Sequence, residues 1–152
     1  MRFEHRARVP ASLDKLWDFL MDVKAVGTCI PGVEEVREID ADNYIGVQKI
    51  KVGPIALRFE GKMTITDRDK EAGRATMKVV GADRGAGGTV NATIIMSITG
   101  LGPNESDLTV VTNADVMGKL GEFGQPVIRK KADAMMSEFT QNLGRRMTSS
   151  DL

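Results

Sequence analysis

The chain has 152 residues, of which 41% are apolar, so its length and composition fit one domain with a buried core. Its 21 basic and 21 acidic residues cancel. That balance argues against a nucleic-acid-binding protein, which needs an excess of Lys and Arg to neutralise phosphates. The single cysteine excludes an internal disulfide framework. The charged N-terminal residues and the absence of an apolar stretch of about 20 residues favour a cytoplasmic protein without a signal peptide or membrane span.

The N-terminal part of the chain predicts one strand followed by short helices. Phe3–Val9 alternates apolar and charged residues, which is typical of a half-buried strand. In Leu13–Leu20 apolar residues recur at i, i+3, i+4 and i+7, which indicates an amphipathic helix with Ser12 as its N-cap. Val26–Ile30 predicts one further helical turn, ended by Pro31–Gly32.

Six further segments alternate like strands and are mostly joined by tight turns. They are Val33–Ile39, Tyr44–Val52, Ile55–Asp67, Arg74–Gly81, Val90–Ile98 and Leu108–Met117. Together with the first strand they predict a seven-stranded antiparallel sheet. The glycine-rich segment Asp83–Gly88 lacks the Gly-Lys-Ser/Thr ending of a phosphate-binding loop and is followed by a strand, so we interpret it as a hairpin tip.

The C-terminal segment predicts a long helix. Apolar residues recur near the helical period from Lys119 to Arg146, with Pro126 in the first turns. We therefore expect a single domain over 1–146 and a polar tail over 147–152. The order of elements is not an alternation of strand and helix, so the fold class is α+β, with a curved sheet around the helix and one or two short helices after the first strand.

Few residues of the chain could carry out catalysis. His5 is the single histidine, and a base needs a placed partner, so we favour a structural or pocket-lining role for it. Cys29 has no histidine near it in the sequence, which favours a small buried hydrophobic residue over a nucleophile. One His and one Cys cannot build a typical zinc site. We therefore predict no catalytic residues and no metal.

The composition of the predicted inner faces indicates an incompletely filled interior. Nine methionines occur beside few aromatic residues, and small residues interrupt the inner faces. Such an interior suits an apolar ligand pocket, because methionine adapts to irregular space. From the inward positions of strands and helix we predict as pocket-lining residues Phe59, Met63, Met77, Val79, Met96, Ala114, Phe123, Val127, Met135 and Phe139.

Several strings of residues resemble one family. The sequence is similar to the CoxG family of carbon monoxide dehydrogenase subunits, within the START-like, polyketide-cyclase-like superfamily of helix-grip domains. The resemblance covers about residues 1–145. The strings that carry it are Pro10, Trp17–Asp22, Cys29–Glu34, Val52–Ile55, Phe59–Gly61 and Ala114–Gly121.

The resemblance implies a non-catalytic accessory subunit of a carbon monoxide dehydrogenase-type molybdenum hydroxylase. Such a subunit would bind a hydrophobic ligand, with a quinone as the best candidate, and would link the enzyme to the inner face of the cell membrane. No tightly bound cofactor is implied. Many relatives continue into a hydrophobic C-terminal anchor, whereas this sequence stops at Leu152, so membrane contact would be transient or would need a longer chain.

Two alternative functions stay open at this point. One is an enzyme of the cyclase or dehydratase type found on the same fold, for which His5 and Asp115 are the candidate polar pair. The other is a purely structural adaptor, which would have a tightly packed interior instead of a cavity.

Overall fold

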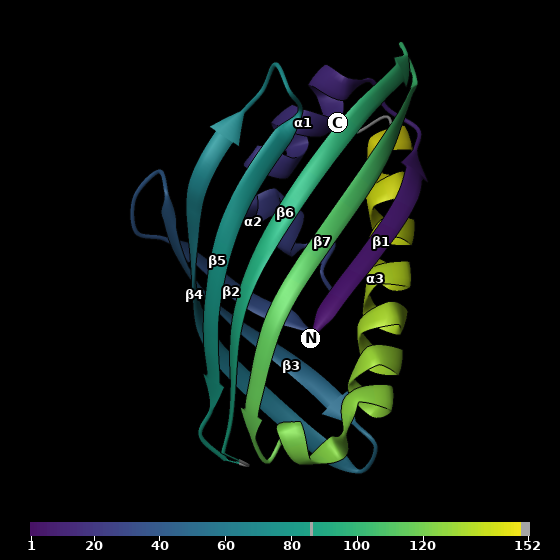
Figure 1. Cartoon of the computed structure of the whole chain (residues 1–152). Helices are drawn as coiled ribbons and strands as arrows, with labels where there is room; N and C mark the ends of the chain where they lie inside the picture. The colour runs from purple at the N-terminus through teal and green to yellow at the C-terminus, as the bar shows by residue number, and fades with distance from the viewer. Residues whose placement is uncertain (86, 150–152) are drawn as a thin grey trace.

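The structure, a computed structural model, describes residues 1–85 and 87–149 as one curved antiparallel sheet and one long helix (Figure 1). In chain order the elements are β1 (Arg2–Val9), α1 (Leu13–Met21), α2 (Val23–Gly27), β2 (Val33–Glu38), β3 (Asn43–Val52), β4 (Ile55–Asp69), β5 (Arg74–Asp83), β6 (Gly88–Gly102), β7 (Glu105–Gly118), η1 (Gly121–Phe123) and α3 (Gln125–Thr148). The strand order is β1-β7-β6-β5-β4-β3-β2. The predicted α+β class, the seven strands and the long C-terminal helix are confirmed.

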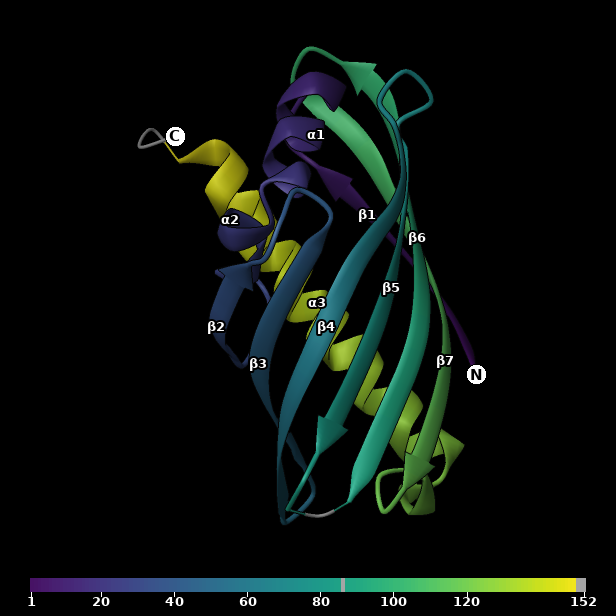
Figure 2. The same ribbon diagram turned by 90° about the vertical axis from the view of Figure 1, so that its left-hand side faces the viewer.

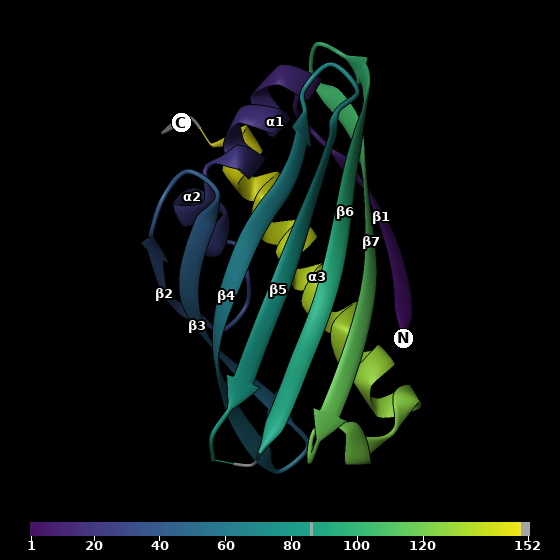
Figure 3. The ribbon, with the colours of Figure 1, turned by 60° about the vertical axis from the view of Figure 1, so that its left-hand side comes forward.

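The long helix crosses the concave side of the sheet. Figures 2 and 3 show α3 running from the end of the sheet that carries η1 to the end that carries α1. We call these the η1 end and the α1 end. The β3–β4 turn, the β5–β6 loop and the end of β7 lie at the η1 end in all three views.

Side chains alternate between the two faces of each strand as the sequence predicts. On β6, Met96 and Ile98 are buried beneath the helices, whereas Asn91 is exposed on the outer face. On β7, Leu108 and Ala114 are buried in the same way. The even-numbered residues of β6 and β7 therefore face α3.

The helices differ from the sequence prediction at their ends. α2 begins at Val23, earlier than predicted, because the Asp22 carboxylate accepts a hydrogen bond from the backbone N–H of Ala25 at 3.3 Å and caps it. The C-terminal helix begins only at Gln125, after Gly124 turns the chain with φ of 85°. It ends at Thr148, beyond the predicted Arg146, because Met147 packs into the core and is 3% exposed. The rest of the predicted polar tail, residues 150–152, lies outside the described residues. No helix within the described residues is both long and apolar enough to cross a membrane.

Candidate ligand-binding interior

Polar contacts fasten α3 to the helices at the α1 end. The side-chain amide of Asn142 donates to the carbonyl of Cys29 at 3.0 Å, and the Lys15 ammonium donates to the carbonyl of Met147 at 2.8 Å. The Arg146 guanidinium lies 5.3 Å from the centre of the Phe19 ring, which adds a cation–π contact. The C-terminal half of α3 is therefore fixed against α1 and the residues around α2.

A second set of contacts fastens α3 along the edge strand β1. Arg129 donates to the backbone carbonyl of Arg2 at 2.9 Å, and its guanidinium lies 5.0 Å from the centre of the Phe3 ring. One turn further along α3, an Asp133 carboxylate oxygen lies 2.7 Å from Nε2 of His5. These contacts hold the helix at one side of the sheet and leave its approach to the middle strands to apolar side chains.

Fully buried apolar residues form two clusters at opposite ends of the sheet. The cluster at the α1 end contains Val9, Ala11, Leu16, Trp17, Leu20, Ala75, Met96, Ile98, Leu108, Leu143 and Met147. The smaller cluster at the η1 end contains Val52, Leu57, Phe59 and Leu120. Each cluster closes one end of the space between sheet and helix.

The inner-face residues between the two clusters are only half-buried. They include Met63, Val79, Ala92 and Ile94 on the sheet and Met136 on α3, none of which belongs to either buried cluster. A side chain that faces a covering helix and still contacts solvent borders unfilled space, because close packing would exclude water. The middle of the interior is thus apolar, covered and loosely packed.

The ten residues predicted to line a pocket divide among these regions. Met96 is buried in the α1-end cluster, against which Met77 and Phe139 pack. Phe59 is buried in the η1-end cluster, against which Phe123 packs. Met63, Val79, Ala114 and Met135 lie between the clusters. Val127 is 43% exposed and lies on the side of α3 opposite Leu143, away from the interior. A ligand-binding role for the set stays a prediction.

Two residues of the interior were missed by the sequence reasoning. Met136 and Ala132 lie on the side of α3 that carries the buried Leu143, and both are half-buried. The phase of the helix relative to Leu143 and Met147 could have identified them. The contact between Asp133 and His5 spans 128 positions of the sequence, and no local pattern indicates it.

His5 lies on the inner face of β1, between α3 and the ring of Phe3. The His5 and Phe3 rings are stacked, with centroids 6.5 Å apart. The imidazole is 18% exposed, and its Nδ1 atom is buried without a hydrogen-bond partner among the described residues. An unpaired buried ring nitrogen is unfavourable unless another molecule bonds to it.

The alternative pairing of His5 with Asp115 is wrong. His5 pairs with Val110 on the inner face of the β1–β7 ladder, whereas Asp115 is exposed on the outer face of β7. An odd number of positions separates Val110 from Asp115, so the pleat directs their side chains to opposite faces. Asp133 of α3 is the carboxylate that meets the imidazole instead. Among the described residues no group of three or more His, Cys, Asp and Glu side chains could hold a metal ion.

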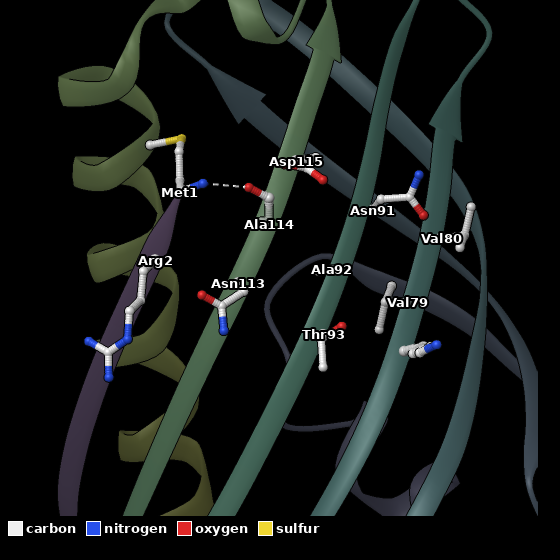
Figure 4. Close-up of a pocket in the computed structure, with 11 residues that line it drawn as sticks. Met1, Arg2, Val79, Val80, Asn91, Ala92, Thr93, Asn113, Ala114 and Asp115 are labelled. Atoms are coloured by element: carbon white, nitrogen blue, oxygen red, sulfur yellow. Dashed lines mark hydrogen bonds between the residues drawn. The ribbon is translucent and has the colours of Figure 1, made fainter.

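An open hollow of about 560 Å³ lies over β5, β6, β7 and the start of β1 (Figure 4). Its polar lining includes Asn91, Thr93, Asn113 and Asp115, which belong to the outer face of the sheet. Because it is open and polar, this hollow does not match the enclosed apolar pocket that the sequence predicts. The half-buried inner face matches that prediction better.

A second hollow of about 410 Å³ lies at the seam between β7 and α3. β1 pairs with β7 only as far as Asn113, and the N-terminal ammonium of Met1 donates to the carbonyl of Ala114 at 2.7 Å. Beyond this point β7 has no strand partner on that side among the described residues. Val116 of β7 and Ile128 of α3 line the hollow, which places an opening beside the apolar interior at the η1 end.

Comparison with known proteins assigns the chain to a family and a fold. A family model that describes CoxG, the G-type subunit of carbon monoxide dehydrogenase, matches residues 6–148. No curated protein sequence matches the chain.

Three solved structures illustrate the similarity of the fold. A conserved protein from Geobacillus kaustophilus has 22% identity and a TM-score of 0.88, with 97% of this chain and 95% of that chain covered. The Zhui aromatase/cyclase from Streptomyces sp. R1128 has 12% identity and a TM-score of 0.71, with 97% and 93% covered. A START superfamily protein from Mycobacterium smegmatis has 13% identity and a TM-score of 0.68, with 96% of each chain covered. At these identities the similarity establishes the START-like helix-grip fold alone.

Proposed function

The chain belongs to the CoxG family of carbon monoxide dehydrogenase subunits, and from this membership we propose that it is a non-catalytic accessory protein that holds an apolar ligand between sheet and helix. The observation that carries the proposal is the half-buried middle of the interior, where Met63, Ile94 and Met136 border unfilled space. A fold stabilised only by packing would bury these side chains as completely as Leu108 and Leu143, which are 1% and 0% exposed.

An isoprenoid quinone is the ligand that we propose for this interior. A quinone ring with an isoprenoid tail is almost entirely apolar, and the inner faces offer methionine and aliphatic side chains along the helix. The seam between Val116 and Ile128 would admit such a ligand from the side. The protein would carry the quinone between a molybdenum hydroxylase of the carbon monoxide dehydrogenase type and the membrane.

Ligand binding can be tested with the single tryptophan of the chain. Trp17 belongs to the buried cluster at the α1 end, beside the interior. Delipidated protein titrated with a naphthoquinone or ubiquinone analogue should show saturable quenching of Trp17 fluorescence. Native mass spectrometry of protein purified from its own host should show a co-purifying apolar molecule. Absence of both signals would refute the proposal.

A matched pair of variants shows whether the quinone analogue enters the interior. Ala92 is half-buried on the inner face of β6, and Thr93 follows it on the outer face. Ala92→Phe should fill the space and weaken binding at least about tenfold, the effect expected when a bulky ring displaces a well-packed part of the ligand. Thr93→Phe should leave binding unchanged. Equal effects of the two substitutions would place the ligand elsewhere.

An enzyme of the cyclase type is the second candidate, and one observation favours it. The His5–Asp133 pair leaves a buried ring nitrogen available for proton transfer, as a general acid–base catalyst requires. The co-purifying ligand, incubated with the protein and followed by mass spectrometry, decides between the candidates. We expect it to stay unchanged; conversion that is lost in His5→Phe would establish an enzyme.

A further inference from the structure

Exposed apolar side chains gather at the η1 end. Within the described residues six large apolar side chains are exposed, and three of them belong to segments at this end: Ile55 at 37%, Met117 at 55% and Val127 at 43%. Ile55 follows the β3–β4 turn, Met117 lies at the end of β7, and Val127 lies in the first turn of α3. They are single side chains on separate segments that reach the same end of the molecule (Figures 1–3).

The same segments carry a strong excess of positive charge. In residues 51–58, 82–85, 87–89 and 117–127 the exposed basic residues are Lys51, Arg58, Arg84 and Lys119, and the exposed acidic residue is Glu122. The other carboxylate in this region, Asp83, is buried and accepts a hydrogen bond from the backbone N–H of Arg58 at 2.9 Å. Among the described residues no exposed carboxylate forms an ion pair with these four basic side chains.

The α1 end has a different charge pattern, because basic side chains there are paired with exposed carboxylates. Arg8 lies 2.9 Å from Glu105 and 2.6 Å from Asp107, and Lys70 lies 3.6 Å from Asp18. The chain as a whole carries no net charge. Its charge is therefore distributed unevenly, with excess positive charge concentrated where the apolar side chains are exposed.

From this juxtaposition we propose that the η1 end docks on the surface of an anionic lipid bilayer, with Ile55, Met117 and Val127 entering the headgroup region and the basic side chains contacting lipid phosphates. Isolated apolar side chains flanked by Lys and Arg are suited to such an interface, since burial of apolar area and attraction to anionic lipid act together. A flat protein partner would require one contiguous apolar patch instead.

The docking surface lies beside the opening into the interior. Met117 belongs both to the exposed set and to the hollow at the seam of β7 and α3. A chain docked by this end would turn the seam toward the bilayer, so that an apolar ligand passes between membrane and interior without crossing water. This inference rests on the proposed ligand carrier for its purpose, but the docking itself is measured independently.

Vesicle co-sedimentation tests the proposal with the full chain. We expect binding to vesicles that contain phosphatidylglycerol, weak binding to pure phosphatidylcholine vesicles, and release at high salt. The double variant Lys51→Gln/Lys119→Gln should lower the partition coefficient on the order of 25-fold, from about fivefold for each basic residue. The double variant Ile55→Asp/Met117→Asp should abolish measurable binding.

Matched substitutions outside the η1 end serve as controls. Leu101 and Ile39 are exposed at 46% and 55% near other hairpin turns, and Lys70 and Arg74 flank the β4–β5 turn. Leu101→Asp/Ile39→Asp and Lys70→Gln/Arg74→Gln should bind vesicles like the wild type. Thermal unfolding followed by circular dichroism verifies that each variant is folded.

The outcomes separate the docking surface from the ligand carrier. Loss of vesicle binding in the η1-end variants, with Trp17 quenching by the quinone analogue retained, supports the proposed surface. Wild-type protein that fails to sediment with anionic vesicles, or η1-end variants that sediment like their controls, would overturn it whether or not the analogue binds. Failure of quinone binding alone would refute the carrier and leave the docking result intact.

Discussion

Asp133 of α3 accepts a hydrogen bond from His5 of β1 across 2.7 Å, and the two residues are 128 positions apart in the chain. A carboxylate accepts and does not donate, so the proton of the neutral imidazole must lie on Nε2 and leave Nδ1 as an acceptor without a partner among the described residues. The contact joins the edge of the sheet to the middle of the long helix.

The tautomer of His5 can be measured directly, because the chain has one histidine. We expect nitrogen-15 spectra of the ring at alkaline pH to show Nε2 protonated and Nδ1 bare. Asp133→Ala should mix the two tautomers and lower the free energy of unfolding by less than about 1 kcal/mol, since the Asp133 side chain is 63% exposed.

Asp133→Asn is the matched control for the tautomer. Its amide oxygen can still accept the Nε2 proton, so the Nε2–H form should persist. A dominant Nδ1–H form in the wild-type protein would contradict the structure. A ligand with a hydroxyl group that reaches the interior should shift the Nδ1 resonance selectively, which would identify the partner of this nitrogen.

Tyr44 provides a prediction about alkaline pH. Burial of its side chain, and then the nearby Glu38 carboxylate, raises the pKa of the Tyr44 phenol above its ordinary value. A raised pKa in the folded state favours folding fully below the ordinary value of about 10 and loses that effect as pH rises through the folded pKa. The free energy of unfolding should therefore fall above about pH 10.

The ultraviolet absorbance of tyrosinate reports this group alone, since the chain has one tyrosine. Native protein should titrate at higher pH than protein unfolded in urea. Glu38→Gln removes one of the two causes and should lower the native midpoint in part. A native midpoint equal to that of the unfolded chain would show that the phenol is not buried.

Two glycines should respond to alanine in opposite directions. Gly144 lies inside α3, and a Cβ built there meets no atom within 4 Å. Gly144→Ala should stabilise the protein by about 0.5–1 kcal/mol, because glycine in a helix restricts more freedom on folding than alanine does. Gly118 has φ of 74° and a Cβ there would collide with the carbonyl oxygen of Gly87. Gly118→Ala should destabilise the protein by at least about 2 kcal/mol. Urea unfolding curves measure both, and a stabilised Gly118→Ala would show that the end of β7 is not held in this conformation.

The sequence was sufficient for the sheet and insufficient for the contacts of the helix. Alternation in segments such as Ile55–Asp67 marks the inner face directly, because a strand exposes every second residue to the same side. The phase of α3 was harder to assign, since its apolar residues are spread around the helix and Val127 was placed inward although it is exposed. The contacts of Asp133, Asn142 and Arg129 depend on which distant segments the fold brings together, and no local pattern encodes them.

The middle of the interior should contribute little to stability if it is a ligand site. Met63 of β4 and Met136 of α3 are half-buried between the clusters, whereas Leu108 of β7 and Leu143 of α3 are buried within one. Leu108→Ala and Leu143→Ala should each lower the free energy of unfolding by about 2–5 kcal/mol. Met63→Ala and Met136→Ala should each cost about 1 kcal/mol or less, since they remove contacts from a space that is already loosely packed.

Each methionine has a leucine control in the same kind of element, so propensity effects cancel within a pair. Urea unfolding of ligand-free protein gives the free energies, and repetition with the quinone analogue adds a second comparison. The analogue should stabilise the wild type by mass action and stabilise Met136→Ala less, because part of its contact surface is gone. If the methionine variants cost as much as the leucine variants, the interior is a packed core. That result would favour the structural adaptor over the carrier, because a packed interior leaves no room for a ligand.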